Sequence, residues 1–165
     1  MSGGVPSERF GPWIAEAEVG RGGTARVFRA RHHEDASLRA ALKLTKPGVG
    51  STEILEGWEL ERRTLARLDV PGVARLLGAG TSETEGPWIA TEWVEGQPLD
   101  AALAEAGAGF DARLRLLEQL CRTLHAVHRQ GVVHGDVRPE NVLATGAGEG
   151  LRCTVVDFGL AGSGT

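Results

Sequence analysis

The sequence has no long apolar run, only two cysteines and no excess of basic residues. No stretch approaches the roughly 18 apolar residues that span a membrane, and the start, MSGGVPSERFGP, contains no signal-peptide core. Cys121 and Cys153 have neither a metal-type spacing nor the pattern of a disulfide framework. We therefore expect a cytoplasmic protein with reduced thiols and no membrane segment.

The charge of the chain gives no support for binding to nucleic acid. The formal net charge is −4 and the sequence pI is about 5.7, whereas nucleic-acid binding favours a basic face. With 41% hydrophobic residues in 165, the chain is long enough to bury a core. We expect a globular protein without a nucleic-acid partner, and its oligomeric state stays open.

Lysine is nearly absent, since Lys43 and Lys46 are the only lysines among eighteen basic residues. A chain that uses arginine for general positive charge keeps lysine where a compact ammonium is needed, for example between phosphates. The position of Lys43, directly after the apolar stretch Ala40–Leu42, therefore draws attention to it.

The chain divides into a strand-rich half and a helix-rich half. Residues 1–12 indicate a flexible tail, and a helix is predicted from Ser51 or Thr52 to about Leu68. Alternating apolar residues and turn signals predict five strands, at 13–20, 25–30, 38–44, 73–78 and 88–94. Residues 95–98 are expected to form a short connector between the two halves. The second half is predicted to contain a short helix, a long helix, short strands and a hairpin turn, at 99–106, 111–130, 132–133, 142–143, 154–156 and 146–150.

The long helix of the second half is predicted from its apolar period. Asp111 is the expected N-cap and Gly131 the C-terminal stop. Its expected buried stripe consists of Leu114, Leu117, Cys121, Leu124 and Val127.

Two short motifs in the second half carry chemistry. Residues 134–141 read HGDVRPEN, and Asp157-Phe158-Gly159 begins sixteen residues after Asn141. The first motif places an aspartate, a cation and an asparagine on one tight loop, and the second places another aspartate after an apolar strand. These groups can hold a metal-bound triphosphate and accept a proton from an attacking hydroxyl.

The two motifs resemble the catalytic loop and the metal-binding motif of eukaryotic-like protein kinases. The residues 138–141, RPEN, are similar to those of serine/threonine kinases. The resemblance implies that Asp136 accepts the proton of the substrate hydroxyl and that Arg138, in place of the usual lysine, neutralises the γ-phosphoryl group. It also implies that Asn141 and Asp157 bind magnesium. Gly135 replaces an arginine that pairs with a phosphorylated activation loop, which predicts weak dependence on such phosphorylation. His134 and Phe158 are expected to pack as core.

A glycine-rich turn lies between two predicted strands, with the pattern Gly20-x-Gly22-x-x-Ala25-x-Val27. A Rossmann site would need a helix directly after the glycines. The strand–turn–strand context instead resembles the loop that covers the nucleotide phosphates in kinases. Ala25 replaces the family's third glycine, so we expect a stiffer loop.

Residues 40–43, AALK, resemble the kinase strand-three motif, with Lys43 at the phosphate-contacting position. In the following helix, Glu61 falls within an apolar stripe formed by Ile54, Trp58, Leu65 and Leu68. A carboxylate on a buried face costs about 1–3 kcal/mol or more without a charged partner. We expect Lys43 to be that partner, as in the kinase family; the alternative is a rotated helix in which Glu61 is solvated.

The stretch Thr91-Glu92-Trp93-Val94 resembles the kinase hinge. This resemblance implies that adenine binds beside Thr91 and meets the backbone of Glu92 and Val94. Its two faces would be enclosed by four apolar side chains, those of Val19, Val27, Ala41 and Leu143.

The resemblance spans about residues 13–161 and implies an α+β, protein-kinase-like fold. An antiparallel five-stranded N-lobe with one long helix (13–94) is followed by a hinge connector (95–98). An incomplete, mainly helical C-lobe (99–165) ends just after Asp157-Phe158-Gly159. Because the activation segment would follow, we expect the 165-residue chain alone to transfer phosphate poorly.

The predicted function is ATP- and magnesium-dependent phosphoryl transfer to serine and threonine hydroxyls of proteins. Small-molecule phosphotransferases of the aminoglycoside or choline kinase type are an alternative, because they share the HGD loop and its asparagine, but they usually lack the DFG motif. A non-catalytic nucleotide-binding or interaction module is a third hypothesis.

Overall fold

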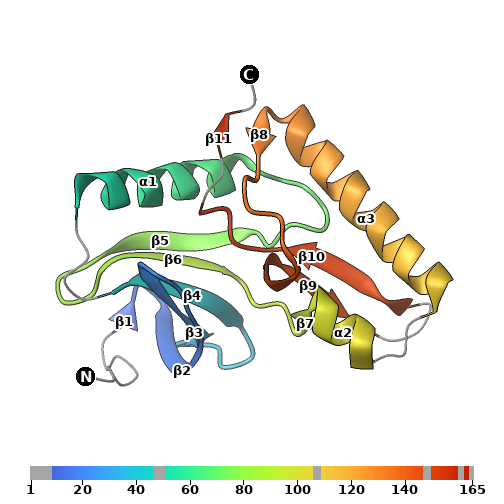
Figure 1. Ribbon diagram of the computed structural model, residues 1–165. Coiled ribbons are helices and arrows are strands. Elements are labelled where there is room, and N and C mark those ends of the chain that lie inside the picture. Colours follow the sequence, from blue (N-terminus) through green and yellow to red (C-terminus); the bar gives the residue numbers. More distant parts are fainter. Residues whose placement is uncertain (1–8, 47–50, 106–108, 147–149, 160–161, 164–165) are drawn as a thin grey trace. The chain divides into compact units, whose positions relative to one another are not determined.

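The computed structural model describes residues 9–46, 51–105, 109–146, 150–159 and 162–163 (Figure 1). The chain divides into two compact units. The first unit comprises Met1–Arg62 and Arg75–Trp93, and the second comprises Arg63–Ala74 and Val94–Thr165. Most of the expected tail and hairpin turn, residues 1–8 and 147–149, lies outside the described residues.

The first unit is built on a six-stranded antiparallel sheet with the order β1-β2-β3-β4-β6-β5. Its strands are β1 (Arg9–Phe10), β2 (Trp13–Arg21), β3 (Ala25–His32), β4 (Arg39–Thr45), β5 (Leu76–Ser82) and β6 (Gly86–Glu92). Five of these are the five strands expected from the sequence, although β5 begins three residues later than its predicted start. They confirm the antiparallel sheet of a kinase-like α+β fold.

The sixth strand, β1, corrects the prediction of a flexible tail through residue 12. Arg9 and Phe10 pair with Ile14 and Trp13 of β2, across a turn in which Gly11 has a φ of +59°. Phe10 is completely buried. Burial of the Phe10 ring stabilises this two-residue strand, although its sequence alone gives little indication of a strand.

The register of the sheet places two sets of side chains on opposite faces. Val27 lies opposite Lys43, and Ala41 lies opposite Thr91, so these four residues share one face because side chains alternate along a strand. The intervening residues point the other way and form the core cluster, which comprises Phe10, Trp13, Ala15, Phe28, Ala30, Ala40, Leu42, Leu44, Trp88 and Ala90. The candidate nucleotide residues are thus kept apart from the core.

Helix α1 (Thr52–Arg67) follows the first three long strands. The carbonyl oxygen of Ser51 accepts the N–H groups of Ile54 and Leu55, so the helix begins where it was predicted. Its buried side is the predicted one: Trp58, Glu61, Leu65 and the following Leu68 are buried, and Ile54 is half-buried. A glutamate therefore does lie on the buried face of this helix.

The second unit combines helices with short strands. Its helices are α2 (Leu99–Glu105), α3 (Phe110–Arg129) and the 3-10 turn η1 (Pro139–Asn141). A three-stranded sheet has the order β10-β9-β7, formed by β10 (Arg152–Val155), β9 (Val142–Thr145) and β7 (Gln97–Pro98), and β8 (Val132–Val133) pairs with β11 (Gly162–Ser163). Helix α3 packs against β10 over a small core of Leu116, Val142, Leu151 and Cys153.

The predicted buried stripe of α3 is mostly wrong. Leu114 and Leu117 are 53% and 56% exposed and Cys121 is exposed. Of the predicted stripe, Val127 is buried and Leu124 is half-buried, and the other buried residues of the helix are Leu116 and Thr123. The helix carries two overlapping apolar faces, and within the described chain the sheet covers the one that contains Leu116. The N-cap is also not Asp111 but Gly109; Asp111 lies in the first turn, where its charge suits the helix dipole.

None of the helices in the described part of the chain combines the length and apolar character needed to cross a membrane.

Candidate active site

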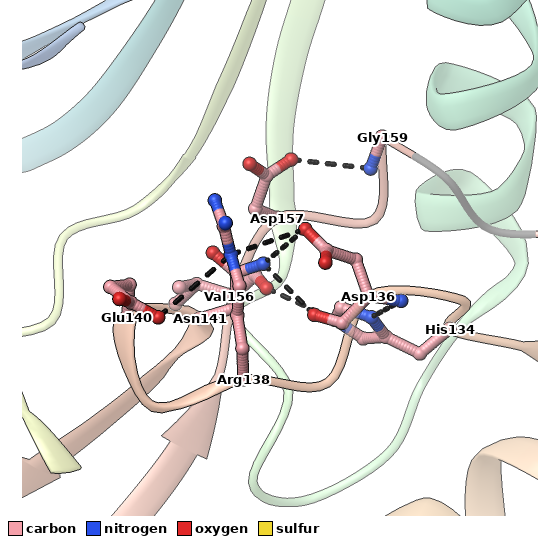
Figure 2. Close-up of polar contacts among 8 residues, drawn as sticks. All are labelled: His134, Asp136, Arg138, Glu140, Asn141, Val156, Asp157 and Gly159. Carbon is pink, nitrogen blue, oxygen red and sulfur yellow. Dashed lines mark hydrogen bonds and ion pairs between the residues drawn. The ribbon is translucent and has the colours of Figure 1, made fainter. Parts of the chain in front are cut away.

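Asn141 holds Asp136 in place on the loop between β8 and β9 (Figure 2). Its Nδ2 donates to the backbone carbonyl oxygen of Asp136 at 3.0 Å and to the carboxylate Oδ2 of Asp136 at 2.9 Å. Asn141 is buried, whereas the Asp136 side chain is 32% exposed. The loop thus fixes a carboxylate that substrate can reach. Because the amide nitrogen faces Asp136, the Oδ1 of Asn141 points elsewhere and can serve as an oxygen ligand.

Arg138 stands beside this carboxylate, as Figure 2 shows. Its Nε lies 3.4 Å from Oδ2 of Asp136 and 3.9 Å from Oε2 of Glu140. The Arg138 side chain is 57% exposed, so its guanidinium is available to an incoming anion. Its backbone carbonyl accepts the N–H of Asn141 at 2.9 Å, and this bond closes the turn that brings the three residues together.

His134 anchors the loop from inside the unit. The N–H of Asp136 donates to its Nδ1 at 3.2 Å, so Nδ1 is the unprotonated nitrogen and Nε2 donates to the carbonyl of Val156 at 3.1 Å. The ring of His134 packs against Phe158 with 4.4 Å between centroids, and both side chains are almost completely buried. The prediction that His134 and Phe158 pack as core is confirmed, and His134 links the loop to the segment before Asp157.

Two residues of the site have a positive φ. Gly135 has a φ of +82°, a conformation that favours glycine, so the absence of the family's arginine here also has a backbone reason. Asp157 has a φ of +59° and is the only residue other than glycine with a positive φ among the described residues. Its Oδ1 accepts the N–H of Gly159 at 3.2 Å, and its side chain is exposed at the end of the segment that follows β10.

Asn141 and Asp157 offer the kind of oxygen ligands that magnesium prefers. The N–H of Val156 donates to the carbonyl of Asn141 at 2.9 Å, which ties the two segments together. Across the described ranges, no cluster of three or more histidine, cysteine, aspartate or glutamate side chains could hold a metal ion by itself. Two protein oxygens fit an ion that takes its remaining ligands from water and phosphate, as magnesium does.

In the first unit, Lys43 of β4 and Glu61 of α1 form the predicted ion pair. The Nζ of Lys43 donates to both carboxylate oxygens of Glu61 at 2.8 Å. The side chains are 18% and 5% exposed, and the Lys43 Nζ lies 5.7 Å from the centre of the Trp58 ring. The alternative with a solvated Glu61 is not the arrangement found. The buried pair fixes the ammonium on the sheet face that also carries Val27, Ala41 and Thr91.

The glycines of the predicted phosphate loop are not required by the fold. Gly20, Gly22 and Gly23 do not have a positive φ, and a Cβ at any of them would meet no described atom closer than 3.7 Å. The N–H of Gly22 donates to the carbonyl of Ala25 at 2.9 Å, which closes the turn. The missing side chains leave open space over the backbone, as close approach by a ligand requires. Ala25 is buried in β3.

The hinge segment contains a partner that sequence reasoning missed. Glu92 donates its N–H to the carbonyl of Arg75 at 2.9 Å and receives the N–H of Arg75 on its Oε2 at 3.2 Å. The Arg75 guanidinium also pairs with Oε1 of Glu92 and lowers the pKa of its carboxyl. The Glu92 N–H is therefore engaged within the protein. No sequence signal links these residues, which lie seventeen positions apart.

The structure groups the remaining predicted site residues by unit. Val19 is 52% exposed at a bulge in β2, and Val27, Ala41 and Thr91 are half-buried, all in the first unit. Val94 and Leu143 belong to the second unit, where the Val94 carbonyl accepts the N–H of Gly96 at 2.9 Å. Each unit thus carries its own constellation: Lys43 with Glu61 and the glycine turn in the first, and Asp136, Arg138, Asn141 and Asp157 in the second.

Comparison with known proteins agrees with this geometry. The protein kinase domain model matches residues 13–164. Similar curated proteins are the serine/threonine-protein kinases PknA and PknD of Mycobacterium tuberculosis, 34% and 31% identical over 98% of this chain, and pkn2 of Myxococcus xanthus, 30% identical over 87%. The chain spans 38%, 24% and 17% of the lengths of these three relatives. The match of the protein kinase domain model to residues 13–164 shows that this chain belongs to the protein kinase family.

Proposed function

We propose that the chain transfers the γ-phosphoryl group of ATP to serine and threonine hydroxyls of a protein substrate. The observation that supports this best is the double hydrogen bond from Asn141 to Asp136. It holds a partly exposed carboxylate beside Arg138 before any substrate binds. Phosphoryl transfer depends mainly on such positioning of groups by the protein.

In the proposed reaction, Asp136 orients the attacking hydroxyl and accepts its proton. Arg138 lies next to Asp136 and is mostly exposed, so its guanidinium can neutralise charge on the transferring phosphoryl group. His134 takes no proton from substrate. It is buried and its two ring nitrogens are already bonded to the backbone of Asp136 and Val156, so its part is to hold the loop.

The nucleotide is proposed to bind through the first unit's sheet face and glycine turn. Lys43, fixed by Glu61, contacts the α- and β-phosphates, and the backbone around Gly20 and Gly22 approaches the phosphates from the turn. We propose, from the family resemblance, that adenine meets the backbone of Glu92 and Val94 beside Thr91. The apolar side chains proposed to enclose its faces are those of Val19, Val27, Ala41 and Leu143.

Asn141 Oδ1 and the Asp157 carboxylate would hold magnesium. The ion, when bound, neutralises charge on the triphosphate. We also propose that the chain consists of an N-lobe of residues 13–94, a connector of 95–98 and a C-lobe segment of 99–165.

The proposed function is tested by replacing the base and measuring two properties of the same samples. Asp136→Asn keeps the size of the side chain but cannot accept a proton. We expect it to abolish transfer of radiolabelled phosphate from ATP to a serine/threonine peptide library, while the Kd for ATP–magnesium stays within about twofold of wild type. Radiolabel makes even slow transfer measurable. Glu140→Gln, an exposed carboxylate in the same loop, is the matched control. Labelling that survives in Asp136→Asn, or a wild-type chain that binds no nucleotide, contradicts the proposal.

A further inference from the structure

Glu18 ties together the two strands that flank the glycine turn. Its carboxylate binds Arg21 twice, with Nε to Oε1 at 2.6 Å and Nη2 to Oε2 at 2.8 Å. The same Oε2 accepts Nη2 of Arg26 at 2.9 Å and Nε of Arg26 at 3.2 Å. Arg21 is the last residue of β2 and Arg26 is the second residue of β3. One carboxylate therefore reaches both strands next to the turn.

This contact lies at an irregular place in the sheet. The pairing of β2 with β3 shifts between Glu18 and Gly20, so Val19 forms a bulge just before the glycines. Ladder hydrogen bonds are disrupted at a bulge, and the glycines beyond it have no side chains to restrain them. Glu18 supplies a side-chain link across a segment where the backbone ladder is interrupted.

One end of the link is rigid. Arg26 is only 3% exposed, and its guanidinium carbon lies 4.6 Å from the centre of the Phe28 ring, which belongs to the core cluster. The other end, Arg21, lies between Gly20 and Gly22 and is 47% exposed. The Arg21 hydrogen bond also lowers the pKa of the Glu18 carboxyl, so the glutamate is charged at neutral pH. The exposed arginine in the turn is thus connected, through one carboxylate, to the core of the unit.

We propose that Glu18 is a positioning residue for nucleotide phosphates. From the sheet face opposite Val27 and Lys43, it holds the Gly20–Gly22 backbone, through Arg21, in the conformation that receives the phosphates. This inference rests on the proposed function. Without the link, the turn samples more conformations, and binding must then order it, which weakens affinity. Adenosine, which has no phosphates, does not need the turn to be ordered.

The chain offers a matched control on the same strand. Glu16 is also a glutamate of β2 that pairs with arginines, in its case Arg29, Arg31 and Arg39, and its side chain is 26% exposed against 22% for Glu18. Glu16 lies farther from the glycine turn. The Glu16→Gln variant therefore measures the effect on binding of losing a paired carboxylate from this sheet in general.

The test compares Glu18→Gln, Arg21→Gln and Glu16→Gln in the 165-residue chain by titration with ATP–magnesium and with adenosine. We expect the first two variants to bind ATP–magnesium about tenfold more weakly and adenosine as wild type does, and Glu16→Gln to bind both normally. Arg21→Gln is included because it leaves the buried Arg26 paired with Glu18 and so spares the fold. Thermal unfolding of each variant identifies any general loss of structure.

Three results would overturn the inference. Equal affinity of Glu18→Gln and wild type for ATP–magnesium would show that the link is irrelevant, and equal weakening toward adenosine would show a general structural defect. Tighter binding by Glu18→Gln would show that Glu18 withholds Arg21 from the phosphates. Lys43→Met separates these outcomes from failure of the proposed function: if wild type binds ATP–magnesium and Lys43→Met does not, the nucleotide site stands whatever Glu18 does.

Discussion

Lys43 and Glu61 meet through both carboxylate oxygens, at 2.8 Å each, with the glutamate almost fully buried. The pair joins the middle of a sheet strand to a helix and fixes the direction of one ammonium group. The chain has one other lysine, Lys46, just beyond the end of the same strand. The two lysines therefore allow a clean comparison.

Lys43→Met should weaken ATP–magnesium binding by roughly 10- to 100-fold, the equivalent of losing one charge-assisted hydrogen bond. Lys46→Met should bind as wild type, although it changes the net charge equally. Isothermal titration of both variants measures this. Similar losses in the two variants would mean that lysine charge acts only at long range.

Asn141→Asp should separate metal binding from positioning of the base. The new side chain still offers an oxygen to magnesium, but it replaces the N–H donor 2.9 Å from the Asp136 carboxylate with a second carboxylate. Repulsion between the two should displace Asp136 and slow phosphoryl transfer about a hundredfold. Single-turnover rates, with magnesium affinity measured in parallel, check this. A variant that transfers phosphate at the wild-type rate would show that the hydrogen bond does not position the base.

Two glycine-to-alanine substitutions should give opposite results. At Gly22 a Cβ has no described neighbour closer than 3.8 Å, whereas at Gly80 it would lie 2.8 Å from the Trp88 ring. Gly22→Ala should keep the wild-type unfolding free energy and lose phosphate affinity. Gly80→Ala should lose about 1–3 kcal/mol of stability because the core is overfilled. Denaturant unfolding and ATP titration of both variants decide the matter, and a destabilised Gly22→Ala would indicate that its glycine serves the fold.

Phe10→Ala should cost about 3–5 kcal/mol of unfolding free energy, the range for removing a buried aromatic ring. The ring is completely buried and its residue pairs with Trp13, so tryptophan fluorescence during urea unfolding is a suitable signal. Arg9→Ala, at the exposed neighbour, should change little. If Phe10→Ala unfolds at the same urea concentration as wild type, the first strand contributes nothing to stability.

The two cysteines should differ in reactivity. Burial raises the pKa of the Cys153 thiol above its ordinary value, so at about pH 8 it contains little thiolate, and it is also sheltered from reagents. Cys121 is exposed. Iodoacetamide at that pH should therefore alkylate Cys121 first, as peptide mass spectrometry can show. Rapid labelling of Cys153 in the native protein would indicate that the packing of α3 on β10 opens readily.

The sequence predicted those parts of the molecule whose evidence is local. The HGDVRPEN loop, the aspartate after β10 and the glutamate within an apolar helix face each need a few neighbouring residues to be recognised. Lys43 and Glu61 could be paired because the chain has only two lysines and one buried carboxylate on that helix face. Where many residues could fill a role, the sequence does not show which of them does. Because the chain has sixteen arginines, neither the pairing of Arg75 with Glu92 nor the arginine partners of Glu18 could be predicted.

The misassigned face of α3 has a related cause. Leu114 and Leu117 repeat with the same helical period as Leu116 and Leu120, so the pattern shows that the helix is amphipathic but not which side is covered. The short strand β1 was not predicted from the sequence for another reason. Two residues carry no periodicity, and only the three-dimensional position of Phe10 shows why they pair.

The left-handed backbone of Asp157 puts the carboxylate proposed to bind magnesium at a position that suits glycine better. A φ of +59° costs a residue with a Cβ about 1 kcal/mol more than it costs glycine. Asp157→Gly should therefore yield a protein at least as hard to unfold as the natural one, yet without the carboxylate proposed to bind magnesium. The carboxylate proposed to bind magnesium is therefore held by a backbone conformation that glycine would adopt at lower cost.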